Sequence, residues 1–198
     1  MSTVPDGLPA DERHYSYRPS LMGAPWVFHL TSDGLAWENG RRSGHVLYRD
    51  IRRVRLSFKP VSLQTQRYVM EVWASGAPKL QAVSSSWKSM VEHERLDKAY
   101  CAFVAELHRR MAEANAPVSF EHGSHPLRYW PGLAIFAAVL LGLAFLILRA
   151  LQSEAPAGAA FVAAFLGLFI WHGANYFRRN RPGVYTPNAL PELLLPKG

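Results

Sequence analysis

Residues 131–148 read PGLAIFAAVLLGLAFLIL, an apolar stretch without a charged side chain. An α-helix of this length rises roughly 27 Å, which is close to the thickness of the hydrocarbon core of a bilayer. Arg128, Tyr129 and Trp130 precede the stretch, and a cation with two aromatic rings is typical of the membrane boundary. The pattern predicts a first transmembrane helix over residues 131–151.

A second uncharged run, residues 155–177, ends on two aromatic residues directly before Arg178 and Arg179. Only a few residues separate the two runs, so the predicted helices must form an antiparallel hairpin. Several arginines flank one end of this hairpin, and only Arg149 flanks the other. Because positive residues concentrate on the cytoplasmic side of membrane helices, we expect both chain termini in the cytoplasm. Residues 1–25 have no apolar signal segment, which favours the same side, and the expected location is the bacterial inner membrane.

Each apolar run carries small residues one helical turn apart, namely Ala138 with Gly142 and Ala163 with Gly167. Small side chains let helix backbones approach closely. These residues either pack the hairpin against itself or contact another membrane protein. His172, near the inner end of the second run, is a further candidate contact, because ionisable residues within membranes are often functional. The alternative for His172 is an interfacial histidine that bonds to lipid headgroups or to Asn175.

The residues before the membrane alternate as β-strands do, most clearly over residues 52–58. There Val54, Leu56 and Phe58 point to one face of the strand, and polar side chains point to the other. Other short segments of this kind are separated by turns that contain glycine. Over residues 89–114, apolar side chains recur every three or four positions, which predicts an amphipathic helix. We therefore predict an α+β fold, a bent antiparallel β-sheet or barrel capped by a C-terminal helix and followed by the two-helix transmembrane hairpin.

The same patterns divide the chain into predicted parts. A mobile N-terminal arm occupies residues 1–20, and the β-rich domain with its capping helix occupies residues 21–114. A juxtamembrane linker, two transmembrane helices and a Pro/Leu-rich cytoplasmic tail follow, at residues 115–130, 131–151, 155–177 and 178–198. The tail is too apolar for a purely solvated linker, so we expect it to dock onto this protein's own domain or onto a partner. The predicted docking residues are Tyr185, Leu190, Leu193 and Leu194.

The domain at residues 25–114 resembles the bacterial form of the pleckstrin-homology (PH) superfold. The resemblance rests on Leu35-Ala36-Trp37, on the step Tyr48-Arg49-Asp50-Ile51 before the strand at residues 52–56, and on the long helix. An aromatic-polar-Asp-Ile step before a strand is frequent in such domains. Bacterial members associated with membranes often carry their helical hairpin before the domain, whereas here it follows. This order suggests a separate family of proteobacterial membrane proteins.

Basic residues of the domain form a candidate contact surface for lipid or for a partner, namely Arg41, Arg42, Arg53, Arg55 and Lys59. A solvated strand face is the alternative. Eukaryotic relatives in the PH superfold that bind phosphoinositides place several lysines and arginines around the first hairpin. In this chain the first predicted hairpin, residues 29–34, carries none. Specific phosphoinositide binding is therefore not expected.

Composition and motifs argue against catalysis and against nucleic-acid binding. The formal net charge of +7 is spread along the chain, without the basic blocks of nucleic-acid-binding proteins. The single cysteine, Cys101, lies seven residues from His108, which is about 10.5 Å along a helix and too far for a nucleophile–base pair. The sequence contains no metal-ligand, phosphate-binding or hydrolase motif. We expect no enzymatic activity, no metal and no cofactor.

The sequence leaves two functions open. The first is a non-enzymatic interaction module that is anchored in the membrane and presents a PH-like domain at the cytoplasmic face. The second is a small accessory subunit of a larger inner-membrane complex, which it contacts through the transmembrane hairpin. The expected partners are the lipid bilayer and either a protein in or at the inner membrane or a second copy of this chain.

Overall fold

The computed structural model describes residues 14–60, 66–88 and 93–196. The structure is α+β, as the sequence predicts, and it divides into two compact units. The first unit comprises Met1–His122 and Gly183–Gly198 and is called the β unit below. The second unit comprises Gly123–Pro182 and is called the hairpin.

A four-stranded antiparallel sheet opens the β unit. Its strands are hydrogen-bonded in chain order, β1 (His14–Tyr17), β2 (Trp26–Leu30), β3 (Gly34–Glu38) and β4 (Ser43–Leu47). Strand β3 has to begin with glycine, because a Cβ atom at Gly34 would lie 2.2 Å from the carbonyl oxygen of Val46. This tight approach holds β3 against β4.

Strand β1 lies where the sequence predicted a mobile arm. Its four residues pair with β2, and they alternate between exposed and buried, with Tyr15 and Tyr17 inside. The expectation of an arm is therefore wrong at residues 14–17, and residues 1–13 lie outside the described part of the chain. The strand was missed because a run of only four residues carries a weak alternation signal.

The second sheet has the strand order β11-β10-β5-β6-β7. It follows the short 3-10 helix η1 (Tyr48–Asp50) and starts with an antiparallel meander, β5 (Ile51–Pro60), β6 (Gln66–Ala74) and β7 (Leu80–Val83). A small separate ribbon comes next, β8 (Ser85–Trp87) with β9 (His93–Arg95). Two late strands complete the sheet, β10 (Ser119–His122), which runs parallel to β5, and β11 (Gly183–Val184), which runs antiparallel to β10.

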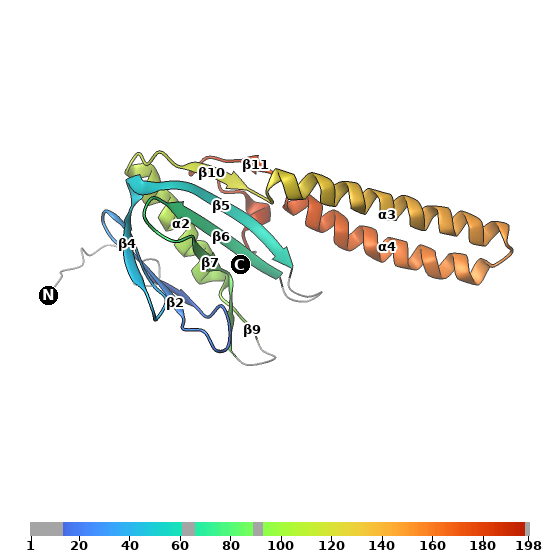
Figure 1. Ribbon diagram of the computed structural model, residues 1–198, viewed down its shortest axis with the longest axis horizontal. Helices are drawn as coiled ribbons and strands as arrows, with labels where there is room; N and C mark the ends of the chain where they lie inside the picture. The colour runs from blue at the N-terminus through green and yellow to red at the C-terminus, as the bar shows by residue number, and fades with distance from the viewer. Residues whose placement is uncertain (1–13, 61–65, 89–92, 197–198) are drawn as a thin grey trace. The chain divides into compact units, whose positions relative to one another are not determined.

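Helix α2 (Asp97–Glu113) packs on the core of the β unit, as Figure 1 shows. Its predicted apolar stripe is confirmed, since Tyr100, Phe103, Leu107 and Met111 are all buried. The Phe103 ring lies 5.2 Å from Tyr15 on β1 and 5.8 Å from Phe28 on β2, measured between ring centroids. The helix therefore holds the first two strands of the first sheet.

The helix starts later than the sequence predicted. The periodicity indicated a start near residue 89, but His93–Arg95 form strand β9 and the helix begins at Asp97. Residues 89–92 lie outside the described part of the chain. The apolar face predicted for β5 is confirmed, because Val54, Leu56 and Phe58 are buried. The opposite face is less open to solvent than an alternating half-buried strand predicts, since Ser57 is also buried and Arg55 is half-buried.

The hairpin consists of helices α3 (Pro126–Gln152) and α4 (Pro156–Arg179), which run side by side in Figure 1. Both helices are long and apolar enough to cross a membrane. Helix α3 starts before residue 131, inside the predicted linker. Proline suits the first helical turn, and the His125 ring accepts a hydrogen bond from the Leu127 amide at 3.3 Å.

The hairpin is an insertion between two neighbouring strands of the β unit. The chain leaves β10 at His122 and returns into β11 at Gly183, and these two residues are paired across the sheet. Residues 123–182 thus form one long excursion between paired strands. The tail that follows the hairpin belongs to the β unit.

Candidate functional site

The predicted basic surface is found on β5 and on the β3–β4 turn. Arg41 and Arg42 are exposed on the turn, where the Asn39 side chain accepts hydrogen bonds from both of their amides, at 3.3 and 2.9 Å. Arg53 and Arg55 belong to β5, and so does Lys59. The two groups therefore sit on different elements.

The three predicted contact residues on β5 are all engaged by neighbouring side chains. The guanidinium carbon of Arg53 lies 4.0 Å from the centre of the Trp73 ring, a cation–π contact. Arg55 forms an ion pair with Glu121 of β10. The Lys59 ammonium lies 3.9 Å from Glu71. Arg55 and Lys59 thus face carboxylates, and Arg53 lies on an aromatic ring. The sequence could not show the Arg55 pair, because Glu121 is far away along the chain.

A cavity of about 290 Å³ opens where β1 meets β7. The side chains that line this cavity include Tyr17, Arg18, Trp26, Arg67, Lys79 and Ser85. A second cavity of about 340 Å³ shares Tyr17 and Arg18 with the first, and it also contains Trp87, Lys88 and Glu94. The two cavities share Tyr17 and Arg18, and together they are called the β1 groove below.

The β1 groove contains a half-buried arginine without a carboxylate partner. Arg67 donates a hydrogen bond from Nε to Ser85 Oγ at 3.1 Å, and burial lowers the pKa of its guanidinium. Within the described part of the chain, no carboxylate forms an ion pair with Arg67 or with Arg18. This site could not be predicted from the sequence, because Arg67 is only the polar first residue of a predicted strand.

The predicted tail docking is seen within the β unit. The Tyr185 hydroxyl lies 2.8 Å from His108 Nε2, and His108 Nδ1 lies 2.7 Å from the Val104 carbonyl oxygen. A neutral ring that donates from Nδ1 to the Val104 carbonyl oxygen and accepts a hydrogen bond from the Tyr185 hydroxyl at Nε2 satisfies both bonds. Leu194 is buried, Leu190 is half-buried and Leu193 is exposed. The tail therefore docks within the β unit. Tyr185 meets His108 of α2, and the 3-10 helix η2 (Glu192–Leu194), which contains the buried Leu194, contacts β5.

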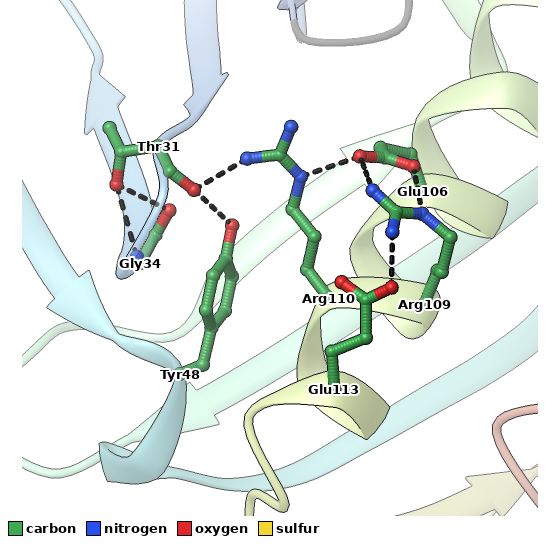
Figure 2. A network of polar contacts seen from close by, with 7 residues as sticks. All are labelled: Thr31, Gly34, Tyr48, Glu106, Arg109, Arg110 and Glu113. Atoms are coloured by element: carbon green, nitrogen blue, oxygen red, sulfur yellow. Dashed lines mark hydrogen bonds and ion pairs between the residues drawn. The ribbon is translucent and has the colours of Figure 1, made fainter. Parts of the chain in front are cut away.

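A polar network joins α2 to the β2–β3 hairpin, as Figure 2 shows. Arg110 donates to the Thr31 carbonyl oxygen at 2.6 Å and forms an ion pair with the buried Glu106. Tyr48 donates to the same carbonyl oxygen at 2.9 Å. Burial opposes ionisation of Glu106, but hydrogen bonds from Arg109 and Arg110 hold its pKa below the usual range. Each polar group of this network meets a partner, so the network fixes the helix and offers no reactive group.

The small residues predicted as helix contacts do not pack the hairpin against itself. Ala138, Gly142, Ala163 and Gly167 are all exposed on the outside of the helix pair. A Cβ atom at Gly142 or Gly167 would meet nothing within 4 Å. Of the two alternatives drawn from the sequence, internal packing is therefore wrong, and contact with another molecule stays a prediction.

Aromatic rings hold the two helices of the hairpin together instead. The Phe136 ring lies 5.1 Å from Phe169 and 5.1 Å from Phe177, measured between ring centroids. A Cβ atom at Gly173 would lie 2.1 Å from the Phe136 ring, so glycine is required there. His172 is exposed, and its Nδ1 lies 3.1 Å from the Leu168 carbonyl oxygen of its own helix.

Across the described residues, no group of three His, Cys, Asp or Glu side chains is placed to hold a metal ion. In comparisons with known proteins, no family model, no curated protein and no solved structure matches this chain.

Proposed function

We propose that this chain is a membrane-anchored, non-enzymatic interaction module, which presents a PH-like domain at the cytoplasmic face of a bacterial inner membrane. Two helices of sufficient length and apolarity support the anchor. The arginines at 128, 178, 179 and 181 support an orientation with both termini in the cytoplasm.

The order of elements in the β unit supports the PH-like assignment. A four-stranded meander is followed by a three-stranded meander, by the short β8–β9 ribbon and then by one long helix that covers the core. This is the arrangement that the resemblance implies. Strands β10 and β11 and the docked tail are additions to it.

The proposal rests on the insertion of the hairpin between two paired strands, β10 and β11. Because the chain leaves at His122 and returns at Gly183, two covalent connections tether the β unit, and they start from neighbouring positions of one sheet. A double tether restricts the reorientation of a domain more than a single flexible linker does. Such an anchor suits a domain that has to present a defined surface to a partner.

The alternative function, an accessory subunit that binds through its hairpin, is favoured by the exposed Ala138, Gly142, Ala163 and Gly167. The two functions differ in which unit contacts the partner. The double variant Gly142→Leu/Gly167→Leu separates them, because both positions open into free space and leucine fits there without disturbing the hairpin. We expect proteins that co-purify with the full chain in mild detergent to be retained by this variant.

Loss of every co-purifying protein in the double variant would favour the accessory subunit and contradict the module. Absence of any specific co-purifying protein with the wild-type chain would contradict both functions. The matched control is Gly173→Leu, which places a side chain against Phe136 and should disrupt the hairpin itself. Comparison with this control separates a lost contact from a misfolded anchor.

A further inference from the structure

A pair of histidines lies on the outer face of the first sheet. His14 of β1 and His29 of β2 occupy directly opposite positions of the antiparallel pair. Both side chains are exposed, because they alternate with the buried Tyr15 and Phe28. The two ring centroids are 4.7 Å apart, and the ring planes are inclined by 50°. No sequence motif reveals this pair, because the two residues meet only when β1 pairs with β2.

The separation of the rings fits two imidazoles that bind the same metal ion. A zinc–nitrogen bond measures about 2.0–2.1 Å, and the angle between two ligands of an ion is about 90–110°. Each ring centroid then lies about 3.2 Å from the ion, so the centroids of two rings on one ion are about 4.5–5.2 Å apart. The observed 4.7 Å lies within this range. Because exposed side chains change rotamer rapidly, one nitrogen of each ring can turn toward a shared ion without a change in the backbone.

Neither ring of the pair is held by another polar group. Among the described residues, no hydrogen bond and no ion pair engages the side chain of His14 or of His29. His45 on the same face provides a contrast, because its Nε2 lies 3.0 Å from the Thr31 hydroxyl oxygen and 3.4 Å from an Asp33 carboxylate oxygen. The ring nitrogens of the pair are therefore open to a ligand, whereas His45 already has polar partners.

The surroundings of the pair favour a positively charged ligand. A metal ion binds the neutral form of imidazole, and partial burial together with the nearby His14 lowers the pKa of His29. Glu38 of β3 lies diagonally opposite His29, because Glu38 pairs with Val27, two positions before His29. The negative charge of Glu38 acts on His29 and stabilises a cation beside it. A divalent ion between the rings thus meets two neutral ligands and a nearby carboxylate.

We propose that His14 and His29 bind one divalent transition-metal ion, such as Zn²⁺, and that water completes its coordination. Imidazole nitrogen suits zinc, nickel and copper, whereas magnesium and calcium prefer oxygen ligands. The described residues place no third His, Cys, Asp or Glu in ligand position, so this is an open site with two protein ligands. The ion would join β1, which ends the four-stranded sheet, to β2. The inference goes beyond the proposed function and does not depend on it.

The test is isothermal titration calorimetry with Zn²⁺ as the probe. The full chain is studied without a histidine tag, in phosphatidylcholine nanodiscs whose scaffold protein also has no tag. We expect His14→Gln and His29→Gln each to weaken Zn²⁺ binding about tenfold or more, because one of two ligands is lost. Glu38→Gln should weaken it about threefold, since only a nearby charge is removed. His45→Gln is the matched control, which removes an exposed imidazole from the same face and should leave the affinity unchanged.

A spectroscopic measurement with Cu²⁺ reports the ligands directly. Electron spin-echo envelope modulation of one equivalent of Cu²⁺ should detect two imidazoles in the wild-type chain and one in His14→Gln or His29→Gln. Glutamine keeps an exposed polar side chain at these positions, so the urea midpoint without metal should stay that of the wild type. An unchanged midpoint separates a lost ligand from a misfolded sheet.

Equal Zn²⁺ affinity of the wild type and His29→Gln would overturn the proposal. An equal loss of affinity in His45→Gln would place the ion elsewhere on the sheet and would also overturn it. Displacement of Zn²⁺ by excess Mg²⁺ would indicate oxygen ligands and would contradict a histidine site. None of these results bears on the interaction module, because co-purification of a partner with the Gly142→Leu/Gly167→Leu chain is measured separately.

Discussion

Removal of residues 183–198 lowers the free energy of unfolding of the β unit by about 4 kcal/mol. Leu194 is 1% exposed, and burial of a leucine side chain contributes about 1.5–3 kcal/mol. Tyr185 adds ring contacts with His108 and Phe120 at 5.7 and 5.6 Å, together with its hydrogen bond. The truncation also leaves the edge of β10 unpaired. Urea titration of the full chain and of the truncated chain in nanodiscs, followed by tryptophan fluorescence, measures the difference.

Two point variants within the tail provide the control. Leu194→Ala creates a cavity and should cost about 2–5 kcal/mol. Leu193→Ala removes a side chain that is 52% exposed and should change stability by less than about 0.5 kcal/mol. Identical urea midpoints for the truncated and complete chains would show that the tail does not stabilise the β unit.

Acidification from pH 6.5 to pH 4 destabilises the β unit by about 3 kcal/mol through His108 alone. This histidine is fully buried, and burial lowers its pKa from 6.5 to about 4. Between these two values the unfolded chain binds a proton that the folded chain does not, so stability falls as the pH falls. The loss of folding stability begins near pH 6.5 and is complete below about pH 4.

The measurement compares urea unfolding at a series of pH values in wild type and in His108→Gln. The pH dependence of the variant should be shallower over this window, because glutamine does not titrate. Tyr185→Phe is the matched control, since it removes a partner of His108 but leaves the buried imidazole, and it should keep the steep dependence. Parallel curves for wild type and His108→Gln would refute the buried neutral histidine.

Features with a short repeat along the chain could be predicted from the sequence. The alternation of Val54, Leu56 and Phe58 identified β5, and the spacing of Phe103, Leu107 and Met111 identified the face of α2. The two apolar helices follow from length and composition alone. In each case the signal is local, because one face of a regular element has to meet either the core or lipid.

Features that depend on distant parts of the chain could not be predicted. Strand β10 becomes a strand because it pairs with β5, and its Glu121 neutralises Arg55 across that pairing. The first cavity of the β1 groove opens where β1 meets β7, and the residues of both cavities come from separate segments between Ser16 and Leu96. The tail was recognised as apolar, but only the fold shows that Tyr185 meets His108.

We propose that the hairpin crosses a membrane and holds the β unit on the cytoplasmic side. Two single-cysteine chains test it in a Cys101→Ser background. Ser153→Cys lies in the exposed link between α3 and α4, and Arg41→Cys lies on the exposed β3–β4 turn. In intact spheroplasts, a membrane-impermeant maleimide should label the cysteine at position 153 and leave the one at position 41 unlabelled until the cells are lysed. Labelling at position 41 before lysis, or protection of position 153 until lysis, would contradict the account.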